Sequence, residues 1–262
     1  MVDYLVVCLV ALFVSALTLF SGFGLGTVLM PAFALFFPVP VAVAATAVVH
    51  LANNLFKVSL VGRKANWSVV VRFAFPGALA AMAGAALLNL FNELKPVWSY
   101  QFGGQVHKIV VVDLVIGVAI VGFAFLDLLP WFRELTFDRK YLPVGGLLSG
   151  FFGGLSGIQG ALRSAFLIKA GLEKESFIGT GTVSAVIVDV ARLLVYGISF
   201  YATKFAGVAP DMGGLILAAT LAAFMGSFIG TRLLEKVTLR TVQIIVGVML
   251  IVVGIGMATG LF

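Results

Sequence analysis

Apolar segments long enough to cross a bilayer recur along the whole chain of 262 residues, and no hydrophilic run between them could form a separate soluble domain. A helix needs about 20 residues to cross a hydrocarbon layer about 30 Å thick. The charged fraction is 11%, whereas roughly 25% is usual in a soluble domain. We therefore expect an all-α polytopic integral membrane protein that lies in the lipid bilayer.

The apolar segments fall into two similar sets. The first set predicts a helical stretch over Tyr4–Phe37 that breaks at Ser21–Gly26, helices over Val41–Val61, Trp67–Leu90 and Lys108–Leu129, and a loop from Asn92 to Val106. The second set predicts a broken stretch over Gly146–Ala170 and helices over Phe177–Tyr201, Gly213–Leu234 and Thr241–Leu261. This division gives an N-terminal repeat (1–130), a connector (131–141) and a C-terminal repeat (142–262).

Matching polar residues support the interpretation as two diverged repeats. Asn54 and Lys57 lie three residues apart and are followed by a glycine five residues later, and Asp189 and Arg192 show the same spacing. Each repeat would consist of a broken Gly-rich helical hairpin and three transmembrane helices.

The distribution of basic residues predicts the orientation. If each Gly-rich stretch crosses the membrane once, the basic residues outside the apolar segments divide evenly between the two sides. If each stretch turns back, Lys95, Lys108 and Lys204 lie on one side and the other eleven on the opposite side. The second arrangement agrees with the positive-inside rule. The two repeats would then have inverted topology, with both termini on the outer side of the membrane.

Composition also excludes several kinds of function. The net charge of +6 is typical of a membrane protein whose cytoplasmic loops collect Lys and Arg, so we expect no nucleic-acid partner. Cys8 is the single cysteine and there are two histidines, too few for a disulfide framework or a metal site. Because no motif for a catalytic nucleophile is readable, we expect neither enzyme activity nor a cofactor.

Asp189 and Arg192 share one face of a predicted transmembrane helix. Charges at membrane depth are costly and face a cavity or another charge. Two interpretations stay open. The pair could simply lock helices together, or Arg192 could attract an anion that Asp189 positions, with Asp189 also exchanging a proton.

The corresponding residues of the first half are Asn54 and Lys57. Lys57 lies near a helix end and could extend to the interface. The neighbouring Asn53 needs hydrogen-bond partners, which a pore or a substrate could supply. His50, one turn before Asn54, is either a packing residue or a proton shuttle near neutral pH.

Five glycines within Gly150–Gly160 should interrupt a helix, because glycine does not restrain the backbone. Gln159 and Arg163 would then lie one turn apart on the helical piece that follows. Exposed amides around Gly157 and Gly160, at the positive end of that piece, would favour an anion. The Arg163 guanidinium offers a planar fork of donors that suits an oxyanion. Alternatively, the glycines only permit close helix packing.

The run Gly157–Leu172, together with a Gly-rich segment ahead of an apolar helix in each half, resembles the TauE/SafE (TSUP) family of sulfite and organosulfonate exporters. This resemblance implies secondary transport of small sulfur-containing or carboxylate anions across the bacterial inner membrane, generally by export.

We therefore expect a secondary active transporter that exports a small sulfur-containing oxyanion, sulfite or an organosulfonate such as sulfoacetate, by alternating access. Proton coupling would run through Asp189 or His50. The expected substrate-binding residues are Gln159, Arg163, Arg192, Asp189, Asn54, Lys57, Gly157 and Gly160. The alternatives are an anion channel and a membrane assembly subunit without a substrate. A homodimer is compatible with the sequence.

Overall fold

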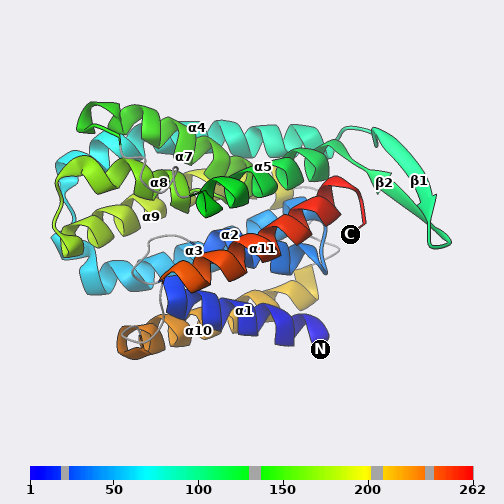
Figure 1. The fold of residues 1–262 in the computed structure, drawn as a ribbon, viewed down its shortest axis with the longest axis horizontal. Helices are drawn as coiled ribbons and strands as arrows, with labels where there is room; N and C mark the ends of the chain where they lie inside the picture. The colour runs from blue at the N-terminus through cyan, green and yellow to red at the C-terminus, as the bar shows by residue number, and fades with distance from the viewer. Residues whose placement is uncertain (19–23, 130–136, 202–208, 234–238, 262) are drawn as a thin grey trace.

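The computed structural model of the chain describes residues 1–18, 24–129, 137–201, 209–233 and 239–261. Within these residues ten α-helices run largely side by side (Figure 1). They are α1 (Val2–Thr18), α2 (Leu25–Ala34), α3 (Val39–Val61), α4 (Trp67–Asn92), α5 (Val111–Leu128), α7 (Leu142–Ser156), α8 (Gly160–Leu167), α9 (Lys174–Tyr201), α10 (Ala209–Leu233) and α11 (Leu239–Ala258). Short 3₁₀ turns, η1 (Gly62–Lys64), η2 (Arg139–Tyr141) and η3 (Ile168–Ala170), join some of them.

Four of the described helices are long and apolar enough to cross a membrane, namely Val39–Lys64, Trp67–Phe91, Lys174–Ile198 and Met212–Gly230. The outer face of α4 agrees with a lipid environment. Val71, Phe75 and Leu79 follow one another at helical spacing and are each more than half exposed. A continuous exposed apolar surface of this kind is typical of contact with a membrane. The chain is therefore a multi-pass helical membrane protein.

The predicted helices are present with their ends shifted by a few residues, but the chain is not entirely α-helical. Part of the expected loop is an antiparallel hairpin of β1 (Trp98–Phe102) and β2 (Gln105–Ile109). Its turn is formed by Gly103 and Gly104, which have φ of 60° and 80°. Two consecutive positive φ values give the turn whose twist suits a two-residue hairpin. The hairpin projects beyond the helices in Figure 1.

The predicted interruption of the second Gly-rich stretch is shorter than expected. Helix α7 continues through Gly150, Gly153 and Gly154 and ends at Ser156. The physical reason is close packing, because a Cβ at Gly150 would overlap the carbonyl oxygen of Gly77 in α4. The glycines of α7 thus permit helix contact, and the break itself begins at Gly157. The first predicted break, Ser21–Gly26, lies largely outside the described residues.

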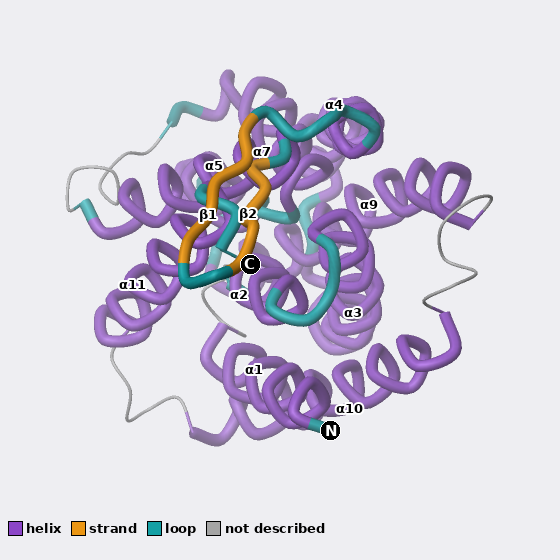
Figure 2. Tube along the Cα trace, turned by 90° about the vertical axis from the view of Figure 1, so that its right-hand side faces the viewer, coloured by secondary structure: helices purple, strands orange, loops and turns teal. Residues whose placement is uncertain are grey.

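Helix packing brings the two halves of the chain together. Helix α4 packs against α7, α10 against α1, α5 against α11, and α3 against α9. Helix α2 is buried along nearly its whole length and lies in the middle of the bundle in Figure 2. Both chain termini lie at the end of the bundle that carries the β-hairpin (Figure 1). Tyr100 in the hairpin donates a hydrogen bond to the carbonyl oxygen of Thr259 (2.7 Å) at this end.

Candidate functional site

The two breaks in the chain meet inside the bundle. Gly157 ends α7 in the left-handed conformation, with φ of 80°, and Gly24 precedes α2 with φ of 124°. Both values favour glycine. An added Cβ at Gly26 would lie 3.0 Å from the carbonyl oxygen of Gly157, so the start of α2 lies against the end of α7.

A pocket lies where these breaks meet, and the first turns of two helices contribute to its wall. Gly24–Thr27 at the start of α2, and Gln159 and Gly160 at the start of α8, line it. Neither N-terminus has a side chain that caps its backbone amides. The amides of a first helical turn have no partner within the helix, and the helix dipole makes this end positive. Two positive helix ends therefore contribute to one pocket.

Two cationic side chains, Lys57 of α3 and Arg163 of α8, also line the pocket. Lys57 is 7% exposed and Arg163 is 5% exposed. Among the described residues, no carboxylate oxygen lies within 4 Å of the Lys57 ammonium. A buried charge is costly unless it is paired. The pocket therefore favours a negatively charged occupant.

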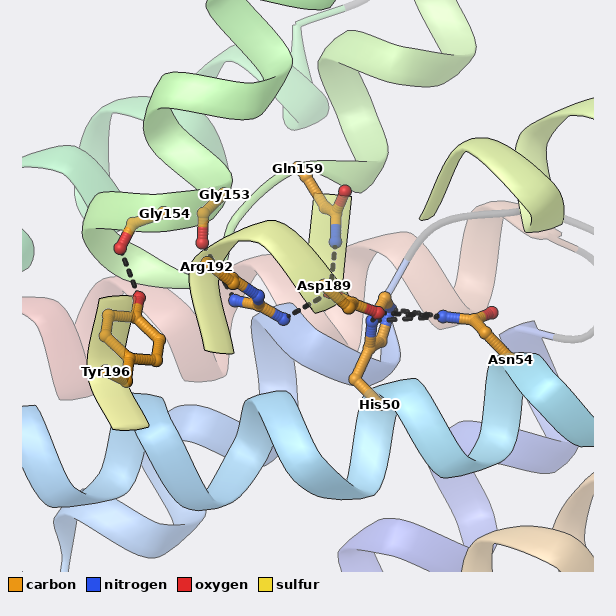
Figure 3. A network of polar contacts seen from close by, with 8 residues as sticks. All are labelled: His50, Asn54, Gly153, Gly154, Gln159, Asp189, Arg192 and Tyr196. Carbon is orange, nitrogen blue, oxygen red and sulfur yellow. Dashed lines mark hydrogen bonds and ion pairs between the residues drawn. The ribbon is translucent and has the colours of Figure 1, made fainter. Parts of the chain in front are cut away.

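Asp189 of α9 lies beside the pocket at the centre of a buried network (Figure 3). Its Oδ1 accepts from Arg192 Nη2 (2.7 Å) and from Gln159 Nε2 (2.9 Å). Its Oδ2 lies 2.6 Å from His50 Nδ1 and accepts from Asn54 Nδ2 (3.4 Å). An ionised carboxylate only accepts hydrogen bonds, so His50 carries a proton on Nδ1. Asp189 thereby links α3, α8 and α9.

Arg192 is fully buried and faces the end of α7 rather than the pocket. Its Nη1 donates to the carbonyl oxygen of Gly153 (2.8 Å). One turn further along α9, the Tyr196 hydroxyl donates to the carbonyl oxygen of Gly154. The Gly153 carbonyl oxygen also accepts from the Gly157 amide (3.1 Å), and a cation near the last carbonyls of a helix interacts favourably with the dipole. Arg192 and Tyr196 therefore fasten α9 to the C-terminal end of α7.

The structure brings most of the expected site residues to one place. The pocket wall includes six of the eight expected substrate-binding residues, together with His50: Asn54, Lys57, Gly157, Gln159, Gly160 and Arg163. Asp189 and Arg192 are not part of the pocket wall and lie behind it. Lys57 does not extend to the interface.

Some polar residues take roles that the sequence analysis missed or left open. Tyr196 was not singled out, although it lies four residues after Arg192 and so on the same helical face. Asn53 belongs to a separate cluster that joins three helices. Its Oδ1 accepts from Ser227 of α10 (2.9 Å), whose hydroxyl lies 2.7 Å from that of Ser15 in α1. Serine side chains of α10 and α1, rather than the pocket, thus provide hydrogen-bond donors for Asn53 Oδ1.

The described part of the chain contains no group of three or more His, Cys, Asp or Glu side chains that could hold a metal ion. The acceptors and donors at the pocket are instead amides, ammonium and guanidinium groups, an imidazole, and the hydroxyl groups of Thr27, Ser164 and Thr182. This set of groups can bind an anion by hydrogen bonding and charge.

Comparisons with known proteins give one positive finding. The sequence model of the family described as sulfite exporter TauE/SafE matches residues 7–257. A search of curated proteins gave no match, and a search of solved structures gave none either. The family match covers almost the whole chain and includes both breaks and every residue of the pocket. The chain belongs to the sulfite exporter TauE/SafE family.

Proposed function

We propose that this protein is a secondary active transporter of a small sulfur-containing oxyanion, sulfite or an organosulfonate such as sulfoacetate, and that it exports the anion across the inner membrane. The observation that supports this best is the convergence of Lys57, Arg163 and two uncapped helix N-termini on one buried pocket. Discontinuous helices whose positive ends point at an anionic substrate are a recurring feature of secondary transporters.

Burial of the proposed binding side chains favours alternating access over a channel. Gln159, Arg163 and Lys57 are each at most 7% exposed, so they do not line an open, water-filled pore. A carrier must open such a site to one side at a time, whereas a channel provides a continuous path. Flux measured in proteoliposomes should saturate with anion concentration and show no unitary currents. Unitary currents would indicate an anion channel instead.

An inverted pair of repeats is part of the proposal. Helices α4 and α10 hold the same place in the two expected repeats, and each packs against the first helix of the other repeat. Gly84 of α4 lies against the carbonyl of Phe151 in α7, as Gly226 of α10 lies against that of Leu12 in α1. The common position of the termini in Figure 1 fits an even number of membrane crossings in total. If the hairpins turn back, the positive-inside rule favours a periplasmic location for both termini.

We expect Lys57→Met and Arg163→Gln each to weaken sulfite binding about tenfold or more. A hydrogen bond to a charged group contributes about 1.5–3 kcal/mol, and 1.4 kcal/mol corresponds to about a factor of ten in Kd. Titration calorimetry on the purified protein would measure the change. Lys64→Gln is the matched control, because the Lys64 side chain is 66% exposed and pairs with Glu175. Unchanged affinity in both site variants, with folding intact, would refute the anion site.

Proton coupling is proposed to involve the His50–Asp189 pair, which lies 2.6 Å apart beside the pocket. We expect an imposed pH gradient to change the rate of sulfite flux in proteoliposomes for the unmodified protein, and we expect His50→Gln to abolish this dependence. The imidazole is the group here whose ordinary titration range lies near neutral pH. Flux that responds equally to the gradient in both proteins would exclude His50 as the coupling residue.

A further inference from the structure

The orientation of the Gln159 side chain is set by Asp189. Asp189 Oδ1 accepts from Arg192 Nη2 and from Gln159 Nε2. Beside an arginine, this carboxylate is ionised and has no proton to donate. The amide nitrogen of Gln159, and not its oxygen, must therefore face Asp189.

The amide oxygen of Gln159 is consequently directed away from Asp189, as Figure 3 shows. Gln159 is 2% exposed, and its Oε1 has no hydrogen-bond donor among the described residues. Leaving a buried acceptor unsatisfied is unfavourable, and native structures rarely do so without a water or a ligand. Because Gln159 forms part of the pocket wall, an occupant of the pocket is the natural source of the missing donor.

The same pocket is lined by Lys57 and Arg163. Its occupant must therefore satisfy two different demands: negative charge for the cations, and an O–H or N–H group for the glutamine oxygen. A fully deprotonated anion without any donor, such as sulfate, meets the first demand alone.

We propose that the pocket selects an oxyanion that also carries a hydrogen-bond donor, and that Gln159 Oε1 accepts this hydrogen bond. The inference rests on the proposed function, since it assumes that the pocket binds an anion. Two sources share the required chemistry, a protonated oxyanion such as hydrogensulfite and a hydroxyalkanesulfonate. Asp189 acts as a positioning residue, because it holds the glutamine amide in the orientation that presents Oε1.

The test uses two probes that differ by a single hydroxyl group. Isethionate (2-hydroxyethanesulfonate) and ethanesulfonate have the same charge, and isethionate alone has an O–H donor. For the full-length protein in detergent, titration calorimetry should give isethionate a Kd about tenfold lower than that of ethanesulfonate, since losing a hydrogen bond to a buried acceptor costs this much or more. In Gln159→Met, which retains the length of the side chain, the two Kd values should become equal.

The outcomes separate this inference from the proposed function. Equal affinity of the unmodified protein for the two probes overturns the donor requirement but leaves the anion site intact. This comparison needs no variant, so it holds even if Gln159→Met fails to fold. Failure of both probes and of sulfite to bind overturns the proposed function itself.

A pH series separates the two sources of the donor. Sulfite loses its proton as the pH rises from 6 to 8.5, whereas isethionate does not change. The titratable and charged groups around the pocket are His50 and Lys57 of α3, Arg163 of α8, and Asp189 and Arg192 of α9. Hydrogensulfite and isethionate carry the same charge, so the effects of these groups cancel in the ratio of the two affinities. A sulfite-to-isethionate ratio that falls with rising pH assigns the donor to hydrogensulfite. Binding of isethionate without measurable binding of sulfite at any pH assigns the donor to a hydroxyalkanesulfonate, and a constant ratio overturns the donor requirement.

Discussion

Replacing Asp189 by leucine should destabilise the protein by about 3–5 kcal/mol, the usual cost of removing one partner from a buried ion pair. Arg192 is fully buried, and its guanidinium would lose the carboxylate that neutralises it. The same substitution removes the shared acceptor of Gln159, His50 and Asn54. Thermal unfolding of the purified protein in detergent would show the change as a large fall in Tm, or as failure to accumulate in the membrane.

Two further variants test whether the unpaired charge of Arg192 causes the loss of stability. Lys64 and Glu175 form an ion pair whose side chains are 66% and 70% exposed, and Glu175→Leu should leave Tm unchanged because exposed pairs contribute little. The double variant Asp189→Leu with Arg192→Met should recover much of the stability, since it leaves no buried charge unpaired. A double variant as unstable as the single one would contradict the charge argument.

The charge swap Asp189→Arg with Arg192→Asp distinguishes the two roles that the sequence left open for this pair. A pair that only locks helices together would tolerate the swap. In the structure, however, Arg192 also donates to the Gly153 carbonyl at the end of α7, and Asp189 orients Gln159 and His50 at the pocket. A carboxylate at position 192 would repel the Gly153 carbonyl, so the swap should reduce both stability and sulfite binding.

Hydropathy and local spacing were sufficient to predict most of the fold. Helices α3, α4 and α9 begin and end close to the predicted residues because long apolar runs between polar turns have few other stable states in a membrane. The β-hairpin was missed because Trp98–Ile109 contributes no membrane-length apolar run, although Gly103-Gly104 between two short segments is a hairpin signal. The proposed inverted arrangement came from the charge distribution alone.

The residues of the pocket were predictable because polar groups are rare in such a chain. Lys57, Gln159 and Arg163 stand out against apolar neighbours, and burying them requires a reason. Their division into pocket wall and supporting network was not predictable. That division depends on the orientation of α9 about its own axis relative to α3 and α7. This orientation directs Arg192 toward the Gly153 carbonyl and away from the pocket. The role of the α7 glycines likewise depended on a partner helix, α4, that lies far away in the sequence.

Gly150→Ala should prevent normal assembly of the bundle, with a loss of stability beyond the roughly 1–3 kcal/mol typical of overpacking. The added methyl group would overlap the carbonyl oxygen of Gly77, and both groups belong to helix backbones that cannot move independently. The α4–α7 contact would have to separate along its length, because Gly154 of α7 lies equally close to the Ala81 carbonyl. Small residues at such contacts are what allow membrane helices to pack closely.

Gly122→Ala in α5 is the matched control, because a Cβ at Gly122 has nothing within 4 Å. Alanine restrains the helical backbone better than glycine and should stabilise this position by about 0.5–1 kcal/mol. Gly150→Ala should therefore lower both the yield of folded protein in detergent and its Tm. Gly122→Ala should raise both quantities. If Gly150→Ala were as stable as Gly122→Ala, helices α4 and α7 could not be in close contact at Gly150 and Gly77.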